Sequence, residues 1–436
     1  MKWSQFNFLF YSRKKGYYLY NTRMLSLIKL DEESYNKLLK IRENPDSAKL
    51  LLSETDYMYF VGAKVLVSEQ EDNNYIEKME YKKRRDSFAS TSLGLVLCPT
   101  LACNFACPYC YERNLPNNVM SEVVQSQLIN FINKNAGKYK SITLDWHGGE
   151  PLLAFKTIKQ IYTRLENESK LPISSSSMVS NGYLLNEGIC NYLASKGLNY
   201  LQITIDGNKF THDKSRILKN GGSSFEKIVE NIDMATELMP NCCIGVRTNI
   251  GLLNKDEYVD LYNELSERWK DKNCSIYHSF IVDNGYYSNC NKQCSHELST
   301  KEKNDFVVNL AKNGIVKKQF IYPKRDCSLY TCTNNNSFVI DPLGYLYKCW
   351  ADVGIHERSV GSLVNGITNY DIFSRFMVGS DKFTDINCRK CTYLPICNGG
   401  CNLSRIRYLE RKVPYNNCSI GDEGLIKYIE TFLELK

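Results

Sequence analysis

The middle of the chain, residues 90–285, alternates short apolar runs with longer amphipathic runs. The apolar runs are typical of buried strands, and the amphipathic runs repeat at the period of a helix. This alternation predicts an α/β fold with a parallel sheet, and six such units indicate a partial (β/α)6 TIM barrel rather than the closed form. The predicted strands are Leu93–Leu97, Ile142–Trp146, Ser177–Ser180, Leu201–Ile205, Ile244–Asn249 and Ile276–Val282. The predicted helices are Ser121–Asn133, Phe155–Glu166, Asn186–Ser195, Ser224–Glu237 and Lys255–Lys270.

The N-terminal residues follow a different pattern, in which aromatic and polar side chains alternate. The runs Phe6–Tyr11 and Tyr17–Tyr20 flank a polar segment and predict a β-hairpin. We expect a helix to begin at Asp31, a shorter helix near Pro45, and a second pair of strands within Tyr57–Val67. This order of elements resembles a small winged-helix domain.

The C-terminal residues show one clear hairpin, whose strands are Ser337–Ile340 and Tyr345–Cys349. The remainder is irregular in pattern, which is typical of a lobe organised by metal more than by an apolar core. We therefore predict three domains, formed by residues 1–85, 86–320 and 321–436.

Composition narrows the class of protein. Of the 436 residues, 43% are hydrophobic and 24% are charged, which excludes a disordered, collagenous or coiled-coil chain. We see neither an apolar run long enough for a membrane helix nor the apolar core of a secretory signal, and so predict a soluble, cytoplasmic protein without a membrane partner. The net charge is +7, and its densest basic run, Lys82–Arg85, is interpreted as a solvated linker rather than a nucleic-acid site.

Cysteine is the residue type that stands out, with 18 in the chain. A secreted disulfide scaffold would be shorter and would carry a signal, so closely spaced cysteines here predict metal ligands. Cys103, Cys107 and Cys110 follow the first predicted barrel strand with the spacing C-x3-C-x2-C. Three thiolates on one loop can bind three irons of a [4Fe–4S] cluster and leave the fourth iron open to another ligand. Zinc held with a remote histidine is the alternative.

This motif, at the end of a first barrel strand, resembles that of the radical S-adenosylmethionine (SAM) superfamily. Three further segments support the resemblance at the ends of the next three strands. They are His147-Gly148-Gly149-Glu150-Pro151, Ser180-Asn181-Gly182 and Thr204-Ile205-Asp206-Gly207. The family often has serine where Thr204 stands, and a hydroxyl group is retained.

The resemblance implies a cofactor site and a chemistry. SAM would chelate the open iron, and a flavodoxin or ferredoxin would supply the electron that cleaves it to methionine and a 5′-deoxyadenosyl radical. The glycine-rich turn would let the backbone approach the methionine part of SAM, and Glu150 would contact its amine. No catalytic acid or base is assigned, and His147 and Asp352 are candidates by position alone. The implied SAM contacts are Gly148, Gly149, Glu150, Ser180, Asn181, Thr204, Asp206, Arg216 and Arg247.

A second set of cysteines lies near the C-terminus, with the spacing Cys332-x11-Gly344-x4-Cys349, Cys388-x2-Cys391-x5-Cys397-x3-Cys401 and then Cys418. It resembles the SPASM domain of radical SAM peptide and protein maturases, with Cys327 as an extra upstream thiol. The resemblance implies that Cys327, Cys332, Cys349 and Cys401 hold auxiliary cluster I and that Cys388, Cys391, Cys397 and Cys418 hold auxiliary cluster II. The cofactors would then be three [4Fe–4S] clusters and SAM, with two structural zinc sites as the alternative for the second set.

Seven cysteines remain outside these groups. Core packing is expected for Cys190, Cys242 and Cys243, and a loop position without a role for Cys290 and Cys294. The others are Cys98 and Cys274.

SPASM enzymes mostly modify polypeptides, and the N-terminal segment resembles the leader-recognition element of enzymes that act on ribosomally made peptides. Such elements bind the leader as an added strand, and Phe6, Phe8, Phe10, Tyr18 and Tyr20 would form the core of the hairpin. The leading hypothesis is a maturase that installs a thioether or carbon–carbon crosslink, or a related modification, in a precursor peptide.

Two alternatives stay open. An anaerobic sulfatase-maturating enzyme would oxidise cysteine or serine to formylglycine, but such enzymes generally carry Asp where Trp350 stands here, after Cys349. A catalytically inactive Fe–S protein that only binds peptide is the alternative of another class.

Overall fold

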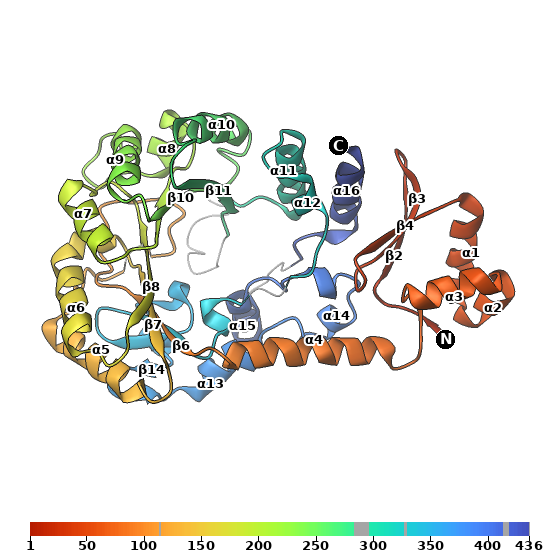
Figure 1. The fold of residues 1–436 in the computed structure, drawn as a ribbon, viewed down its shortest axis with the longest axis horizontal. Coiled ribbons are helices and arrows are strands. Elements are labelled where there is room, and N and C mark those ends of the chain that lie inside the picture. The colour runs from red at the N-terminus through yellow and green to blue at the C-terminus, as the bar shows by residue number, and fades with distance from the viewer. Residues whose placement is uncertain (113–114, 283–295, 327–328, 413–417, 436) are drawn as a thin grey trace. The chain divides into compact units, whose positions relative to one another are not determined.

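The computed structural model describes residues 1–112, 115–282, 296–326, 329–412 and 418–435 (Figure 1). Its centre is a ten-stranded sheet in the order β11-β10-β9-β8-β7-β6-β12-β13-β14-β15. Strands β6 to β11 all run parallel, so the predicted parallel α/β sheet is confirmed. Their bounds are Ser92–Leu97, Ser141–Trp146, Ile173–Ser180, Tyr200–Thr204, Cys243–Ile250 and Cys274–Phe280.

The predicted C-terminal hairpin extends this same sheet. Strand β12 (Ser337–Ile340) pairs in parallel with β6, and β13 (Tyr345–Tyr347) pairs antiparallel with β12. The short strands β14 (Gly361–Ser362) and β15 (Gly366–Ile367) complete the edge. The hairpin therefore continues the hydrogen-bonded ladder of the barrel strands.

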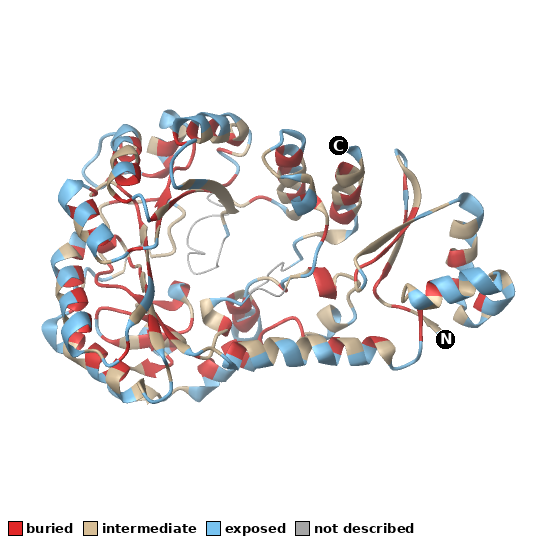
Figure 2. Cartoon of the chain, in the orientation of Figure 1, coloured by how far each residue is buried: buried red, intermediate tan, exposed pale blue. Residues whose placement is uncertain are grey.

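Helices cover the outer face of the parallel strands (Figure 1). Side-chain caps fix where they begin: Ser121 accepts a hydrogen bond from the Val124 backbone N–H, and Asn186 accepts one from Ile189. The helices carry buried residues as well as exposed ones, as expected for helices that cover a sheet on one side (Figure 2). The sequence does not predict α8 (Lys209–Ser215), but all five predicted helices are confirmed. These five are α5 (Glu122–Asn135), α6 (Phe155–Glu168), α7 (Glu187–Ser195), α9 (Phe225–Leu238) and α10 (Tyr258–Arg268).

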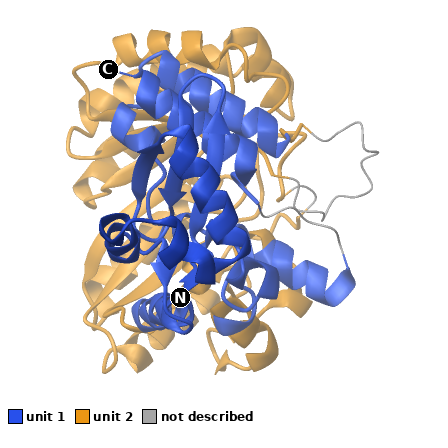
Figure 3. Cartoon of the chain, turned by 90° about the vertical axis from the view of Figure 1, so that its right-hand side faces the viewer, with its two compact units in different colours: residues 1–87, 299–329, 378–436 blue, residues 88–298, 330–377 orange. Residues whose placement is uncertain are grey.

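The chain divides into two compact units (Figure 3). Residues 88–298 and 330–377 form the unit that contains the ten-stranded sheet, here called the barrel unit. Residues 1–87, 299–329 and 378–436 form the other, here called the terminal unit because it joins both ends of the chain.

The terminal unit is built around the antiparallel sheet β2-β3-β4, with strands Asn7–Ser12, Gly16–Asn21 and Ser26–Leu30, so the predicted N-terminal hairpin is confirmed. Strands β1 (Lys2–Trp3) and β5 (Leu66–Val67) pair separately. The remaining N-terminal helices are α1 (Glu32–Glu43), a 3-10 turn (Pro45–Ser47), α2 (Ala48–Leu51), α3 (Glu54–Gly62) and α4 (Glu71–Phe88).

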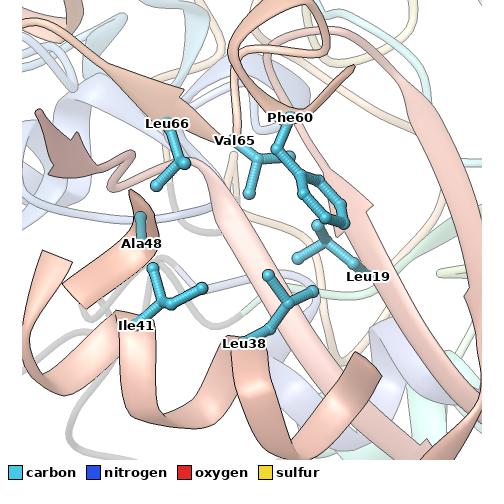
Figure 4. Close-up of a cluster of buried hydrophobic side chains, with 7 residues drawn as sticks. All are labelled: Leu19, Leu38, Ile41, Ala48, Phe60, Val65 and Leu66. Carbon is cyan, nitrogen blue, oxygen red and sulfur yellow. The ribbon is translucent and has the colours of Figure 1, made fainter. Parts of the chain in front are cut away.

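Both faces of this small sheet are buried. On one face, Leu19 of β3 packs against α1, α2, α3 and β5 in a cluster that Figure 4 shows. On the other face, Phe10, Tyr18 and Tyr20 pack with Leu425 and Ile429 of α16 (Gly421–Glu434). Because strand side chains alternate between faces, one hairpin supplies two cores. The N-terminal strands therefore share a hydrophobic core with the C-terminal helix. The cluster in Figure 4 consists of Leu19, Leu38, Ile41, Ala48, Phe60, Val65 and Leu66.

Two N-terminal predictions are wrong. The segment Tyr57–Val67 is not a strand pair: most of it lies in α3, because the Ser53 hydroxyl accepts a hydrogen bond from the Asp56 backbone N–H at 3.0 Å and caps a helix there. The basic run Lys82–Arg85 is not a linker but part of α4, where Arg84 binds Asp381 at 2.7 Å.

The C-terminal residues are also more regular than predicted. Instead of an irregular lobe, the described ranges hold several helices in addition to α16. These are α13 (Tyr370–Ser374), α14 (Ile386–Arg389) and α15 (Asn402–Arg411), while α11 (Thr300–Lys312) and α12 (Lys318–Ile321) precede the predicted lobe. Across the same described ranges, no helix is long and apolar enough to cross a bilayer.

The cluster in Figure 4 gives the first testable prediction. Leu38 is fully buried, so Leu38→Ala should lower the free energy of unfolding by about 2–5 kcal/mol through lost transfer energy and a residual cavity. Urea denaturation measures the change. The same substitution at Leu50, which is 86% exposed on α2, should change it by less than about 0.5 kcal/mol. Equal effects at the two positions would contradict the burial of α1 against the sheet.

Candidate functional site

The three cysteines of the first motif lie in the loop that leaves the carboxyl end of β6. Cys107 is buried, and Cys103 and Cys110 are half-buried. Burial raises the pKa of Cys103 to about 11 and that of Cys110 to about 12. Thiols in such a place stay protonated near neutral pH unless a positively charged group compensates the thiolates. The donor set therefore fits an iron–sulfur cluster bound through three thiolates.

The turn Gly148-Gly149 lies directly against this cysteine loop. A β-carbon on Gly149 would stand 2.3 Å from the Ala102 carbonyl oxygen, and one on Gly148 would stand 2.3 Å from that of Thr100. Gly148 also has φ +118°, which favours glycine. Two hydrogen bonds join the segments, from the Gly149 N–H to Thr100 O at 3.3 Å and from the Glu150 N–H to Ala102 O at 2.8 Å. Only glycine at these positions allows the two backbones to approach so closely.

Glu150 is fully buried and joins the ends of two strands. One carboxylate oxygen accepts hydrogen bonds from the Ser180 hydroxyl (2.9 Å) and the Leu152 N–H (3.0 Å), and the other accepts one from the Asn181 N–H (2.7 Å). The Asn181 amide in turn donates to the Asn104 side chain of the cysteine loop at 2.7 Å. The structure thus brings together three predicted SAM contacts, Glu150, Ser180 and Asn181, and connects them to the loop.

A second buried group of polar side chains surrounds Asp206, at the end of β9. Its carboxylate accepts hydrogen bonds from the Tyr109 hydroxyl and, at 2.8 Å, from the Asn249 N–H. Arg216 lies 3.8 Å from the same carboxylate and donates to the Tyr109 hydroxyl at 3.1 Å. Tyr109, which stands between Cys107 and Cys110, is the residue that sequence reasoning missed here. The sequence did contain a signal for Tyr109, because a side chain inside the cysteine motif must lie at the same strand ends as the cysteines.

His212 contacts the backbone of Asp206. The His212 Nδ1 accepts a hydrogen bond from the Asp206 N–H at 3.2 Å, and Nε2 lies 3.2 Å from the Ser224 hydroxyl. Burial lowers the pKa of His212 to about 3, so the ring is neutral, with Nδ1 as acceptor and the proton on Nε2. Nothing in the sequence pattern indicated this role, since His212 belongs to the unpredicted helix α8.

A cavity of about 230 Å³ opens beside this group at the carboxyl ends of the strands. Tyr109, Asp206, Asn249 and Asn254 contribute polar groups to it, and Leu253 contributes an apolar wall. Such a pocket, mostly preformed and with convergent polar groups, is typical of a small-ligand site.

Two predicted contacts, Thr204 and Arg247, take no part in these side-chain networks. They lie side by side in the register of β9 and β10. Within the described residues, the buried Nε atoms of Arg216 and Arg247 have no hydrogen-bond partner. These donors could bind an anionic group of a ligand.

The two residues considered as acid or base by position differ in their surroundings. The His147 Nδ1 accepts a hydrogen bond from the Gly148 N–H at 2.7 Å, Nε2 faces the Tyr111 hydroxyl at 3.3 Å, and the ring stacks on Trp350. Asp352 is fully buried and lies 3.6 Å from the Arg358 guanidinium. Asp352 therefore has the surroundings of a structural ion pair rather than of a base open to substrate.

The second set of cysteines is distributed over both units. Cys388, Cys391, Cys397 and Cys418 all belong to the terminal unit. Burial raises the pKa of Cys391, and the Cys397, Cys388 and Cys418 thiols raise it further, so these three lie within electrostatic reach of Cys391. Cys401 also belongs to the terminal unit, whereas Cys332 and Cys349 belong to the barrel unit. Cys327, Cys290 and Cys294 lie outside the described residues.

Three of the cysteine sulfurs in the terminal unit accept hydrogen bonds. The Arg405 guanidinium donates to the Cys388 sulfur at 3.1 Å, the Tyr393 N–H to Cys391 at 3.3 Å and the Gly399 N–H to Cys397 at 3.3 Å. Hydrogen bonds to sulfur are one of the ways a protein stabilises cluster thiolates. Among the described residues, no three cysteine, histidine or acidic side chains converge on a point as ligands of a single metal ion. A cubane does not need such convergence, since each thiolate binds a separate iron.

Comparison with known proteins relates this arrangement of residues to a family. The profile of the Radical SAM superfamily matches residues 97–265, which include the cysteine loop, the Gly148-Gly149 turn and Asp206. Residues 97–265 therefore form a Radical SAM domain, and the chain is an enzyme. Its [4Fe–4S] cluster and SAM follow from that assignment, and Cys103, Cys107 and Cys110 are the residues that fit the cluster.

Curated relatives align with most of this chain. The radical SAM cyclopropyl synthase TigE of Paramaledivibacter caminithermalis is 25% identical over 374 residues, which are 79% of this chain and 74% of the relative. A cysteine-type anaerobic sulfatase-maturating enzyme of Clostridium perfringens is 23% identical over 352 residues, 72% of this chain and 90% of the relative. A serine-type enzyme of Klebsiella aerogenes is 23% identical over 319 residues, 69% of this chain and 77% of the relative.

Solved structures share the fold. Native anSMEcpe with bound AdoMet and Cp18Cys peptide gives a TM-score of 0.60 at 17% identity, covering 79% of this chain and 96% of that one. Streptococcus suis SuiB bound to the precursor peptide SuiA gives 0.53 at 14% identity, covering 96% of this chain and 99% of that one.

The approach of the two backbones gives a prediction for cluster assembly. Gly149→Ala would force the Ala102 and Leu101 carbonyls away and displace the cysteine loop, at a stability cost of about 1–3 kcal/mol. Iron content and visible absorbance of anaerobically purified protein should fall. Gly137→Ala is the matched control, because nothing lies within 4 Å of its β-carbon. Full cluster occupancy in Gly149→Ala would refute the tight packing.

The buried His212 gives a pH-dependent prediction. Its pKa is about 3 in the folded protein and 6.5 as a free side chain, so only the unfolded state takes up a proton as the pH falls below 6.5. His212 therefore costs stability progressively at acid pH, by up to about 1.4 kcal/mol per unit. In His212→Asn, an amide oxygen can still accept the Asp206 N–H, but the titration is gone.

The check is urea unfolding of both proteins at pH 7.5 and pH 5.5. The stability deficit of His212→Asn relative to the original protein should shrink by about 1.4 kcal/mol at the lower pH. A deficit that does not change with pH would mean that His212 is accessible to protons in the folded state.

Proposed function

We propose that this enzyme is a radical SAM peptide maturase that modifies a ribosomally made precursor peptide. The observation that carries the proposal is the combination, in one chain, of the three-cysteine loop against the Gly148-Gly149 turn and the separate cysteine group 388–418. The relatives support it, since TigE is a cyclopropyl synthase and SuiB and anSMEcpe are solved with peptides bound. The proposed modification is a thioether or carbon–carbon crosslink or a related modification.

Each part of the site has a role in this proposal. When bound, the cluster and SAM supply reductive cleavage of SAM to methionine and a 5′-deoxyadenosyl radical, which removes a hydrogen atom from the peptide. Glu150, Ser180 and Asn181 hold the segment that faces the methionine end of SAM. Tyr109, Asp206 and Asn249 line the cavity of about 230 Å³, which suits the nucleoside end. The Nε donors of Arg216 and Arg247 can meet the SAM carboxylate.

The second cysteine set is proposed to hold two auxiliary [4Fe–4S] clusters. Cys388, Cys391, Cys397 and Cys418 form the group for auxiliary cluster II, and their mutual electrostatic effect supports this assignment. Auxiliary cluster I is assigned to Cys327, Cys332, Cys349 and Cys401 by the SPASM resemblance alone. A flavodoxin or ferredoxin remains the proposed electron donor, and the cytoplasm the proposed location.

The terminal unit is proposed to bind the leader of the precursor. Strand β4 pairs with β3 on one side only within the described part of the chain. An edge strand presents unpaired backbone groups that an extended peptide can join as a further strand. The buried aromatic core of the hairpin holds this edge in place.

Sulfatase maturation is the second candidate, because two of the relatives are sulfatase-maturating enzymes. Against it, Trp350 follows Cys349, and the next carboxylate, Asp352, is buried beside Arg358. The two candidates predict different products from different peptides.

Co-expression with a small open reading frame that neighbours the gene, followed by mass spectrometry, tests the proposal. A crosslink lowers the precursor mass by two hydrogens without gain of oxygen. A precursor without its leader should bind at least about tenfold more weakly, while uncoupled SAM cleavage stays unchanged. Formylglycine in a sulfatase peptide, with the precursor unchanged, would favour the second candidate.

The cluster assignment gives a prediction of its own. Replacing Cys103, Cys107 and Cys110 together by alanine should reduce dithionite-driven formation of 5′-deoxyadenosine to background, because the cluster loses its three protein ligands. Chromatographic quantification of 5′-deoxyadenosine measures this. Cys274→Ala, on β11 and outside the motif, is the control and should retain cleavage. Turnover in the triple variant would place the open cluster elsewhere.

A further inference from the structure

The terminal unit contains a second cavity, of about 280 Å³, that the proposed chemistry does not use. One face of α4 forms one wall, through Tyr75, Lys78, Met79 and Lys82. The other walls are formed by Arg325, Asp326, Leu329, Lys382, Phe383, Pro395 and Asn398. All of these belong to the same compact unit, so the cavity is a property of that unit alone.

The charge of the lining is strongly biased. Five cationic side chains contribute to it, against only Asp86 and Asp326 as acidic ones. Two of the five, Lys83 and Lys382, are engaged: Lys83 lies 3.6 Å from Asp381, and Lys382 donates to the Leu394 and Cys397 carbonyls at 2.9 and 2.5 Å. Arg325 is engaged as well, because its guanidinium donates to the Arg23 carbonyl at 3.0 Å, which leaves Lys78 and Lys82.

Lys78 and Lys82 are the important pair. They are exposed and stand one helical turn apart on α4, so their ammonium groups point from the same face. Within the described ranges neither has an ion-pair partner. Two like charges held one turn apart repel each other, and a bound anion would relieve that repulsion.

The cavity also has apolar surfaces. Phe383 is 3% exposed and belongs to a buried cluster with Phe6, Ile76 and Leu394, against which Tyr75 and Met79 pack. Ion pairs hold the walls together, since Arg84 binds Asp381 at 2.7 Å and Arg389 binds Glu80 at 2.9 Å. The site is therefore built before any ligand arrives, which lowers the entropic cost of binding.

The volume and the charge of this cavity indicate which kind of ligand it can bind. A volume near the lower end of ligand pockets takes a few side chains and not a large cofactor. A folded acidic protein would touch only the rim, whereas an extended peptide can place a carboxylate at Lys78 and Lys82 and an apolar side chain against Tyr75. We propose that this cavity binds an extended acidic segment of the precursor peptide, carboxylates at the lysines and an apolar residue at the ring. This inference rests on the proposed function as a peptide maturase.

The test uses a defined probe, the peptide Glu-Phe-Asp-Glu-Leu-amide labelled with fluorescein at its N-terminal amine, with its Gln/Asn counterpart carrying the same label as the analogue without side-chain charges. Fluorescence anisotropy with the full-length enzyme should show tighter binding of the acidic peptide, which weakens as salt rises. The double variant Lys78→Gln/Lys82→Gln should weaken that binding about tenfold, as expected for two partly exposed charge pairs. Lys138→Gln/Lys140→Gln removes the same charge from exposed positions outside the cavity and should leave affinity unchanged.

Each outcome decides the matter. Equal affinity for the acidic peptide and its Gln/Asn counterpart, or equal weakening by both double variants, overturns the proposal. Unchanged peptide affinity in Lys78→Gln/Lys82→Gln together with slower reduction by flavodoxin overturns it in favour of a docking site for an acidic redox protein.

Formation of 5′-deoxyadenosine and modification of the precursor are measured in parallel. If precursor is modified but the probe does not bind, the cavity proposal fails and the proposed function stands. If no peptide is modified, the proposed function itself fails.

Discussion

The approach of two backbones, at Gly148-Gly149 and at residues 100–102, is the constraint on which the cofactor site depends. It brings the end of β7 against the loop that carries Cys103, Cys107 and Cys110, and hydrogen bonds from Gly149 and Glu150 fix the distance. Since a β-carbon would collide with carbonyl oxygens there, the loop conformation and the glycines require each other. The three cysteines are thus positioned by the sheet and not by the loop alone.

Glu150 extends this constraint to the third strand. Burial raises the pKa of its carboxyl group, and hydrogen bonds from Asn181, Leu152 and Ser180 act in the opposite direction. A buried carboxylate is tolerated only where such donors replace water. The hydrogen bonds to Glu150 therefore join the ends of β7 and β8. Asp206 repeats the arrangement at β9, with Tyr109 and Asn249 as donors and the neutral His212 behind it. Two buried carboxylates, Glu150 and Asp206, therefore hold the ends of neighbouring strands through hydrogen bonds.

The sequence predicted most of the barrel because its signals are local. Apolar runs, caps such as Ser121 and Asn186, and cysteine spacing all act within a few residues. The prediction of strands within Tyr57–Val67 is wrong because aromatic side chains favour strands there, whereas the Ser53 cap stabilises a helix. The polar run of α4 gave no amphipathic signal strong enough to show that Arg84 and Lys83 reach Asp381, nearly 300 residues away. His212 and Tyr109 escaped for the same reason: their partners come from other strands, and only the assembled sheet defines them.

The sharing of one core by both chain ends has a consequence for how peptide binding can be studied. Besides the packing of Phe10, Tyr18 and Tyr20 on α16, hydrogen bonds join residues next to the N-terminal strands to the cysteine segment 388–392. Gln5 donates to the Arg389 carbonyl at 2.8 Å and Thr22 to the Thr392 carbonyl at 2.5 Å. Removing residues 1–85 would therefore expose the face of α16 and release the loop that carries Cys388 and Cys391. Loss of activity in such a truncation could therefore have two causes: disorder of the cysteine group, or loss of the leader-binding site. Point changes such as Lys78→Gln/Lys82→Gln, which leave these cores intact, separate the two effects where a truncation cannot.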